Sequence, residues 1–114
     1  MAEPTHAVFL TKGAQNDLET LHAYIAAHRS ASEAEQLVDA LFDVIDSLER
    51  FPMRGPVPQE LHILGVDTFR QRLLPPYRLI YEVNDDKVYI SVIADGRRDM
   101  QALLEQRILG TRDI

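Results

Sequence analysis

Cysteine is absent from the 114-residue sequence, and this absence excludes several kinds of chemistry. The chain has no disulfide framework, no thiolate nucleophile and no sulfur ligand for zinc. Residues 1–10 lack the basic segment and the apolar run of a secretion signal, and no stretch approaches the ~20 apolar residues that span a bilayer. We therefore expect a soluble cytoplasmic protein with no membrane partner.

Length and composition favour one domain. With 114 residues, 46% of them hydrophobic, the chain can bury roughly two thirds of its unfolded surface around a single core. No internal repeat and no low-complexity tract interrupts the sequence. We therefore expect residues 1–114 to form one domain.

Positive charge is scarce and unevenly placed. The formal net charge is −6, and Lys12 and Lys87 are the only lysines. Residues 1–50 hold three basic and nine acidic residues, whereas residues 51–114 hold nine of each, and eight of those nine bases are arginine. Coating nucleic acid needs clustered cations, so the overall charge argues against that role. The arginines of the second half are suited to directional contacts with another macromolecule.

A strand and a helix are predicted at the start of the chain. Residues 6–10 form a short apolar run of β-prone residues. Thr11 can cap a helix, in which apolar residues recur at helical spacing from Ala14 to Ile25. This stripe predicts a helix that is buried on one side.

A second helix is predicted to follow at once. Ser32 with Glu35 has the spacing of a capping box and should open this helix. Pro52 disfavours helical conformation at Phe51, so the helix should end there. Because the connection between the two helices is short, we expect them to form an antiparallel hairpin.

Three strands and a last helix are predicted in the second half. A loop rich in Pro and Gly at residues 52–58 precedes them. The strands are expected at residues 68–74, 77–83 and 87–94. Pro75-Pro76 and the turn at residues 84–86 separate them, and a short helix is expected at about residues 100–109. The predicted order is therefore β-α-α-β-β-β-α, an α+β fold.

The predicted sheet has two chemically different faces. One face of the middle strand carries Tyr77, Leu79, Tyr81 and Val83, and the other carries Arg78, Ile80 and Glu82. The helical hairpin must bury its apolar stripes, and one face of the antiparallel sheet is the natural surface for this. We expect the opposite face to carry part of the arginine set, available to another macromolecule.

A linked series of motifs resembles the RelE/ParE toxin superfamily over nearly the whole chain. The first helix contributes Ala14, Asp17-Leu18 and Tyr24-Ile25. Further matches are S-L-E-R-F-P-M-R-G at residues 47–55, F-R-Q-R-L-L at 69–74, P-Y-R-L-I-Y-E-V at 76–83 and I-A-D-G-R-R-D at 93–99. Each motif is weak alone, but their order and spacing carry the resemblance.

The resemblance implies the toxin of a bacterial type II toxin–antitoxin module, of the kind associated with plasmid stabilisation. A cognate antitoxin would neutralise it by wrapping an extended or helical segment across it, in a hetero-oligomer. No cofactor and no metal are implied. RelE-like members are metal-independent endoribonucleases that cut mRNA on the ribosome, whereas ParE-like members inhibit DNA gyrase without an established enzymatic chemistry.

A nuclease would need a base, a proton donor and cations for the phosphate. In that case the candidates are Asp95 as base, Tyr81 or Tyr89 as proton donor, and arginines to hold the phosphate. These arginines are Arg70, Arg72 and Arg78. Many relatives have His after the last strand, where this chain has Asp95, and all four histidines precede the predicted three-stranded part. This departure from the family pattern weakens the case for acid–base chemistry.

Electrostatics favours the ParE-like alternative. A protein of net charge −6 approaches the phosphate surface of a ribosome against its own field, whereas a protein target makes no such demand. We therefore favour gyrase as target over the ribosome and its mRNA, and a protein that is not an enzyme. The residues expected to bind the target are Arg70, Arg72, Arg78, Arg97 and Arg98.

Two less specific interpretations stay open. A protein-interaction module of the same fold, without toxicity, would show the same pattern, since an open sheet edge invites an added strand. Individual residues also have ordinary structural roles available. The tyrosines are common sheet-packing residues, Asp95-Gly96 is a common turn pair, and Asp99 can cap the last helix.

Overall fold

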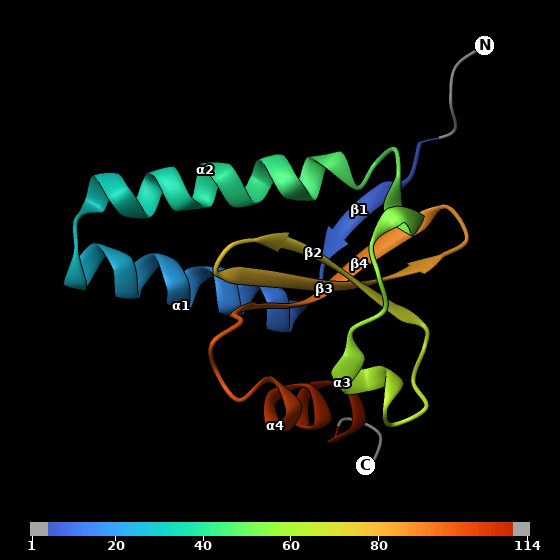
Figure 1. Ribbon diagram of the computed structural model, residues 1–114. Coiled ribbons are helices and arrows are strands. Elements are labelled where there is room, and N and C mark those ends of the chain that lie inside the picture. Colours follow the sequence, from blue (N-terminus) through green and yellow to red (C-terminus); the bar gives the residue numbers. More distant parts are fainter. Residues whose placement is uncertain (1–4, 111–114) are drawn as a thin grey trace.

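A four-stranded sheet of order β1-β4-β3-β2 forms the centre of the computed structural model, which describes residues 5–110 (Figure 1). The strands are β1 (Ala7–Leu10), β2 (Phe69–Leu74), β3 (Tyr77–Asn84) and β4 (Lys87–Asp95). The helices are α1 (Lys12–His28), α2 (Ala31–Ser47), η1 (Pro52–Arg54), α3 (Gln59–His62), α4 (Met100–Leu104) and η2 (Glu105–Leu109). The predicted α+β fold and its order of main elements are confirmed; η1 is an additional short helix in the predicted loop at residues 52–58, and α3 is one in a segment for which no element was predicted.

The first strand, β1, lies beside β4 and so extends the predicted antiparallel meander by one strand. β1 pairs in parallel with β4, while β4, β3 and β2 pair antiparallel to one another. β1 and β2 are therefore the two edges of the sheet. The pairing of β3 and β4 shifts register between Ile80 and Tyr81, which leaves Ser91 of β4 as an extra residue, a β-bulge.

The cap of α2 lies two residues earlier than predicted. Ser30, in extended conformation, accepts a hydrogen bond from the backbone N–H of Glu33 at 3.0 Å. The predicted capping by Ser32 and Glu35 is wrong, because Ser30 and Glu33 have the same three-residue spacing. Glu35 instead contacts His22 of α1 at 2.7 Å and so links the two helices.

The end of α2 also comes earlier than predicted. The α-helix ends at Ser47 rather than Phe51, and Leu48 follows as its C-cap. The N–H of Leu48 donates to the carbonyl of Ile45, three residues back. The last turn is therefore tighter than an α-helical turn, in which the acceptor lies four residues back. Pro52 begins the short helix η1 instead of directly terminating α2.

Both faces of the sheet are covered. On one face, α1 and α2 enclose a core that includes Leu41, Leu48, Leu79, Tyr81 and Ile90. On the opposite face, α3 and α4 lie over a second core formed by Leu61, Ile80, Val92, Ala94, Met100 and Leu104. Figure 1 shows α2 above the sheet and α3 and α4 below it. The expectation that this second face is open is therefore wrong.

The register also separates the strand arginines. Arg70 and Arg72 pair with Tyr81 and Leu79, so they lie on the face of the helical hairpin. Arg78 alternates with those two core residues and lies on the face of α3 and α4. The face opposite the hairpin thus carries part of the arginine set, as expected, but of these three arginines only Arg78 lies on it.

Candidate functional site

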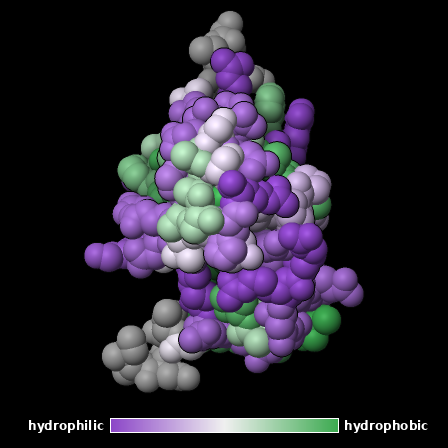
Figure 2. Space-filling view, turned by 90° about the vertical axis from the view of Figure 1, so that its left-hand side faces the viewer, coloured by the Kyte–Doolittle hydropathy of each residue, from purple (hydrophilic) through white to green (hydrophobic). Residues whose placement is uncertain are grey.

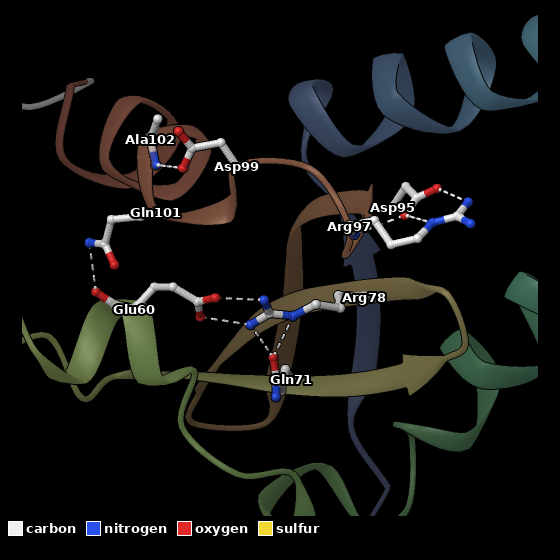
Figure 3. Close-up of polar contacts among 8 residues, drawn as sticks. All are labelled: Glu60, Gln71, Arg78, Asp95, Arg97, Asp99, Gln101 and Ala102. Atoms are coloured by element: carbon white, nitrogen blue, oxygen red, sulfur yellow. Dashed lines mark hydrogen bonds and ion pairs between the residues drawn. The ribbon is translucent and has the colours of Figure 1, made fainter.

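Arg78 lies inside a polar cluster beneath α3 and α4 (Figure 3). Its two terminal nitrogens each donate to one carboxylate oxygen of Glu60 at 2.8 Å, and its Nε donates to Gln71 Oε1 at 2.9 Å. The side chain of Arg78 is only 14% exposed. The hydrogen bond from Arg78 is the main cause that lowers the pKa of Glu60, against the opposing effect of burial. The guanidinium group of Arg78 therefore donates its hydrogen bonds to other side chains of the protein.

Two neighbours fix this cluster in place. Gln101 of α4 donates to the backbone carbonyl of Glu60 at 3.2 Å and so connects α4 to α3. Gly96 passes so close that a Cβ there would lie 2.8 Å from the side chain of Arg78. The loop after β4 needs glycine at this position because no larger residue leaves room for Arg78.

Arg70 and Tyr81 hold the loop that leads into α3. Arg70 donates from one guanidinium nitrogen to the carbonyls of Met53 and Gly55, at 3.1 and 2.9 Å. The buried hydroxyl of Tyr81 donates to the carbonyl of Pro52 at 2.6 Å. Burial raises the pKa of Tyr81, although the positive charge of Arg72 opposes the rise. Both Arg70 and Tyr81 thus serve the fold of residues 52–55.

The half-buried Asp95 and the exposed Arg97 form a pair at the end of β4 (Figure 3). One carboxylate oxygen of Asp95 accepts from the backbone N–H of Arg97 at 2.9 Å and from its Nε at 3.0 Å, and the other accepts from its Nη2 at 2.6 Å. The hydrogen bond from the Arg97 side chain is the main cause that lowers the pKa of Asp95, and its backbone N–H adds to the effect. Arg97 is 77% exposed, so its guanidinium remains accessible from solvent.

A trough surrounds this pair and extends to the end of α1. Two depressions, of about 410 and 400 Å³, are both lined by Ile25, Arg29, Tyr77 and Arg97. Arg98, Tyr24 and His28 line the second depression. The rings of Tyr24 and His28 stack with centroids 4.1 Å apart. We call this surface the arginine trough and define it by Tyr24, Ile25, Arg29, Tyr77, Arg97 and Arg98.

Figure 2 views this end of the molecule, where the turn between α1 and α2 meets the loop after β4. Hydrophilic residues dominate the face, with smaller hydrophobic patches among them. The trough therefore lies in a polar surface, unlike the covered cluster around Arg78.

The structure separates the five arginines expected to bind a target into three places. Arg97 and Arg98 lie together in the arginine trough, Arg70 and Arg72 lie at the edge strand β2, and Arg78 lies beneath α3 and α4. The contribution of α1 was missed from the sequence. Arg29 belongs to the acidic half of the chain, and no spacing links it to Arg97. The one available signal was a cation at the C-terminal end of a helix, a common position for arginine.

A third depression, of about 550 Å³, lies near the start of α1 and is lined by Thr11, Phe69 and Arg107. Its wall contains Arg107, which donates to Asp17 at 2.9 Å and to the carbonyl of the bulge residue Ser91 at 2.7 Å. Asp17 also accepts from the backbone N–H of Ile93 at 3.0 Å. This network joins α1, β4 and η2, and it explains the place of Asp17 in the fold.

Within residues 5–110, no group of three or more His, Cys, Asp or Glu side chains is placed to hold a metal ion. None of the helices in that range combines the length and the apolar character that crossing a bilayer requires.

Comparisons with known proteins agree with this architecture. Residues 8–100 match the family described as the ParE toxin of the type II toxin–antitoxin system parDE. Among solved structures, the chromosomal ParDE toxin–antitoxin system from P. aeruginosa superimposes with a TM-score of 0.68 at 16% identity, covering 82% of this chain and 98% of that chain. The toxin–antitoxin complex RelBE2 from Mycobacterium tuberculosis gives a TM-score of 0.58 at 22% identity, covering 80% and 91%. The search of curated proteins finds no match.

The helical hairpin on a four-stranded sheet agrees with membership of the RelE/ParE toxin superfamily. The family match covers more than half of the sequence. The chain belongs to the ParE toxin family of type II toxin–antitoxin systems.

Proposed function

We propose that this chain is a toxin that inhibits DNA gyrase by binding it and that has no nuclease activity of its own. The observation that carries the proposal is that three side chains a nuclease would use already make contacts within the protein. Arg78 is held by Glu60, Tyr81 donates to a backbone carbonyl, and Asp95 is paired with Arg97.

The protonation states argue in the same direction. A general base works best when its pKa lies near the operating pH, but the pKa of Asp95 is lowered below its ordinary acidic value. A proton donor should have a pKa that is not raised, but burial raises the pKa of Tyr81. Asp95 and Tyr81, two of the three candidates for proton transfer, therefore have pKa values shifted away from neutral pH.

The placement of the arginines supports the same proposal. Cations that stabilise one phosphate must converge on it. Arg70 and Arg72 lie on the hairpin face of the sheet, whereas Arg78 lies on the opposite face. The body of the sheet thus separates them, and they cannot contact one phosphate together. The net charge of −6 adds a general repulsion from ribosomal RNA.

We assign target contact to the exposed end of the molecule. Arg97 and Arg98 are exposed and project from the loop after β4, so they are the first candidates. Arg72 is half-buried at the edge strand and is a secondary candidate. Arg70 and Arg78 act through the fold, because their guanidinium groups hold residues 53–60.

A cognate antitoxin is the second partner that we propose. Both similar structures are described as toxin–antitoxin systems, and this chain spans nearly the whole length of each matched chain. The complex would be a hetero-oligomer in the cytoplasm, where gyrase and ribosomes both reside. Residues 1–114 would act in it as one domain.

The test compares the two toxin mechanisms on the same purified protein. Its cellular arm is growth arrest on expression, reversed by co-expression of the antitoxin, which separates a toxin from an inert binding module. Its biochemical arms are gyrase supercoiling and ribosome-dependent cleavage of mRNA. We expect inhibition of supercoiling and intact mRNA. Cleavage of mRNA with active gyrase contradicts the proposal.

A further inference from the structure

The arginine trough combines an apolar floor with a cationic rim. Ile25 is nearly buried, and Tyr77 packs against the core formed by α1, α2 and the sheet. Arg29, Arg97 and Arg98 are exposed around them, and they outnumber the two carboxylates that also line the depressions, Glu33 beside Arg29 and Asp95 beside Arg97. Because the two depressions share four lining residues, an extended ligand can cross from one to the other without leaving the surface.

We propose that the arginine trough binds a short acidic segment of the target protein. One carboxylate of that segment contacts Arg97 and Arg98, and a neighbouring apolar side chain lies on the floor beside Ile25 and Tyr77. This inference rests on the proposed function and adds to it the chemistry of the recognised segment.

Asp95 shows the geometry that a carboxylate of the partner would adopt. It contacts Arg97 through two oxygens, with the shorter contact at 2.6 Å. Bidentate pairing of this kind is the contact for which the planar guanidinium is suited. Because Asp95 itself lines the trough beside Arg97, its negative charge also opposes an incoming acidic segment. Removing that charge should therefore strengthen binding.

Charge favours a peptide over a nucleic acid as the occupant. Glu33, near the start of α2, lines the trough, and the exposed carboxylates Asp39 and Asp43 lie further along this helix. A nucleic-acid strand is a continuous line of charge and would have to run near these carboxylates. A short peptide needs only one or two acids at the rim. The apolar floor also matches a peptide side chain.

Binding is tested by titrating the full chain with three probes while backbone amide shifts are followed by NMR. The first probe is a peptide of about ten residues in which Asp and Glu surround Leu and Phe. The second has the same sequence with Asn and Gln in place of the acids, and the third is a single-stranded oligothymidine of similar charge. We expect saturable binding of the acidic peptide, with shifts concentrated in the arginine trough, and much weaker binding of the other two.

Variants then identify the contacts. Asp95→Asn keeps an oxygen for the backbone N–H of Arg97 but loses the charge, and it should tighten peptide binding about two- to fivefold. Replacing both Arg97 and Arg98 by Ala should weaken binding about five- to tenfold. Glu49→Gln and Lys87→Ala are matched controls, because they remove one charge of each sign far from the trough. Neither control should change the affinity.

The proposal is overturned if the acidic peptide does not bind, if oligothymidine binds more tightly, or if the trough variants bind like the controls. Gyrase supercoiling with the same proteins keeps this outcome separate from the proposed function. Gyrase inhibition that survives loss of Arg97 and Arg98 supports the proposed function and rejects the trough as its contact. Peptide binding without gyrase inhibition supports the trough and rejects gyrase as the target.

Discussion

Arg78 and Arg97 each hold a carboxylate through two contacts, but the two arginines lie in opposite surroundings. The two carboxylates are exposed to the same degree, Glu60 at 23% and Asp95 at 24%, but the side chain of Arg78 is only 14% exposed, whereas that of Arg97 is 77% exposed. Water compensates Arg78 less well for a lost partner, so its contact serves the fold. Solvent or another molecule can reach the guanidinium of Arg97, so this arginine can serve binding. The comparison teaches that exposure, more than pairing, separates structural from functional arginines here.

The largest effect is expected from breaking the covered pair. Glu60→Ala leaves the charge of Arg78 poorly compensated beneath α3 and α4, and it should lower the free energy of unfolding by about 2 kcal/mol. Urea denaturation measures this loss. Arg97→Ala breaks the Asp95 pair by removing its exposed partner and should leave the urea midpoint unchanged. Equal losses in the two variants would contradict the distinction between the pairs.

Glu60, the partner of Arg78, was not identified from the sequence. Periodicity and alternation gave both long helices, all four strands and the face of Arg78, because these patterns record local geometry. They did not indicate α3, since four residues are too few to show a helical repeat. Glu60 therefore could not be linked to Arg78, which is 18 positions away. Contacts between distant segments have no local signature.

The cap of α2 and the trough were missed for a related reason. Ser30 and Ser32 are each followed three residues later by a glutamate, so the sequence pattern alone offers two equivalent starts. The turn after α1 selects Ser30. In the same way, only the folded hairpin brings Arg29 beside Arg97.

A smaller effect should separate two tyrosines of β3. Tyr81→Phe leaves the carbonyl of Pro52 without its buried donor and should lower the free energy of unfolding by about 1 kcal/mol. Tyr77 lines the trough, and Tyr77→Phe should leave stability unchanged. Thermal unfolding of both variants gives the comparison. If Tyr77→Phe lowered the free energy of unfolding as much as Tyr81→Phe, the hydroxyl of Tyr77 would stabilise the fold and the contrast between the two tyrosines would be wrong.

The smallest expected effect is a dependence on pH. The pKa of Glu60 is lowered from an ordinary value of 4.5 in the folded protein. Its ionised form therefore stabilises the fold above pH 4.5, and this contribution is lost as the pH falls through the lowered folded pKa. The stability difference between the wild type and Glu60→Gln should be constant near neutral pH and shrink in acid. A difference that grows on acidification is incompatible with this pairing.

The central claim is that the accessible arginines bind a protein target while the covered arginine supports the fold. The direct measurement is the concentration of purified protein that halves gyrase supercoiling, for the wild type and for the chain with Arg97 and Arg98 replaced by Ala. We predict inhibition by the wild type and at least about tenfold weaker inhibition by the folded double variant, a change of about 1.4 kcal/mol in binding. Ribosome-dependent mRNA cleavage by the wild type, retained in the double variant and lost on Arg78→Ala with the fold intact, would contradict the claim.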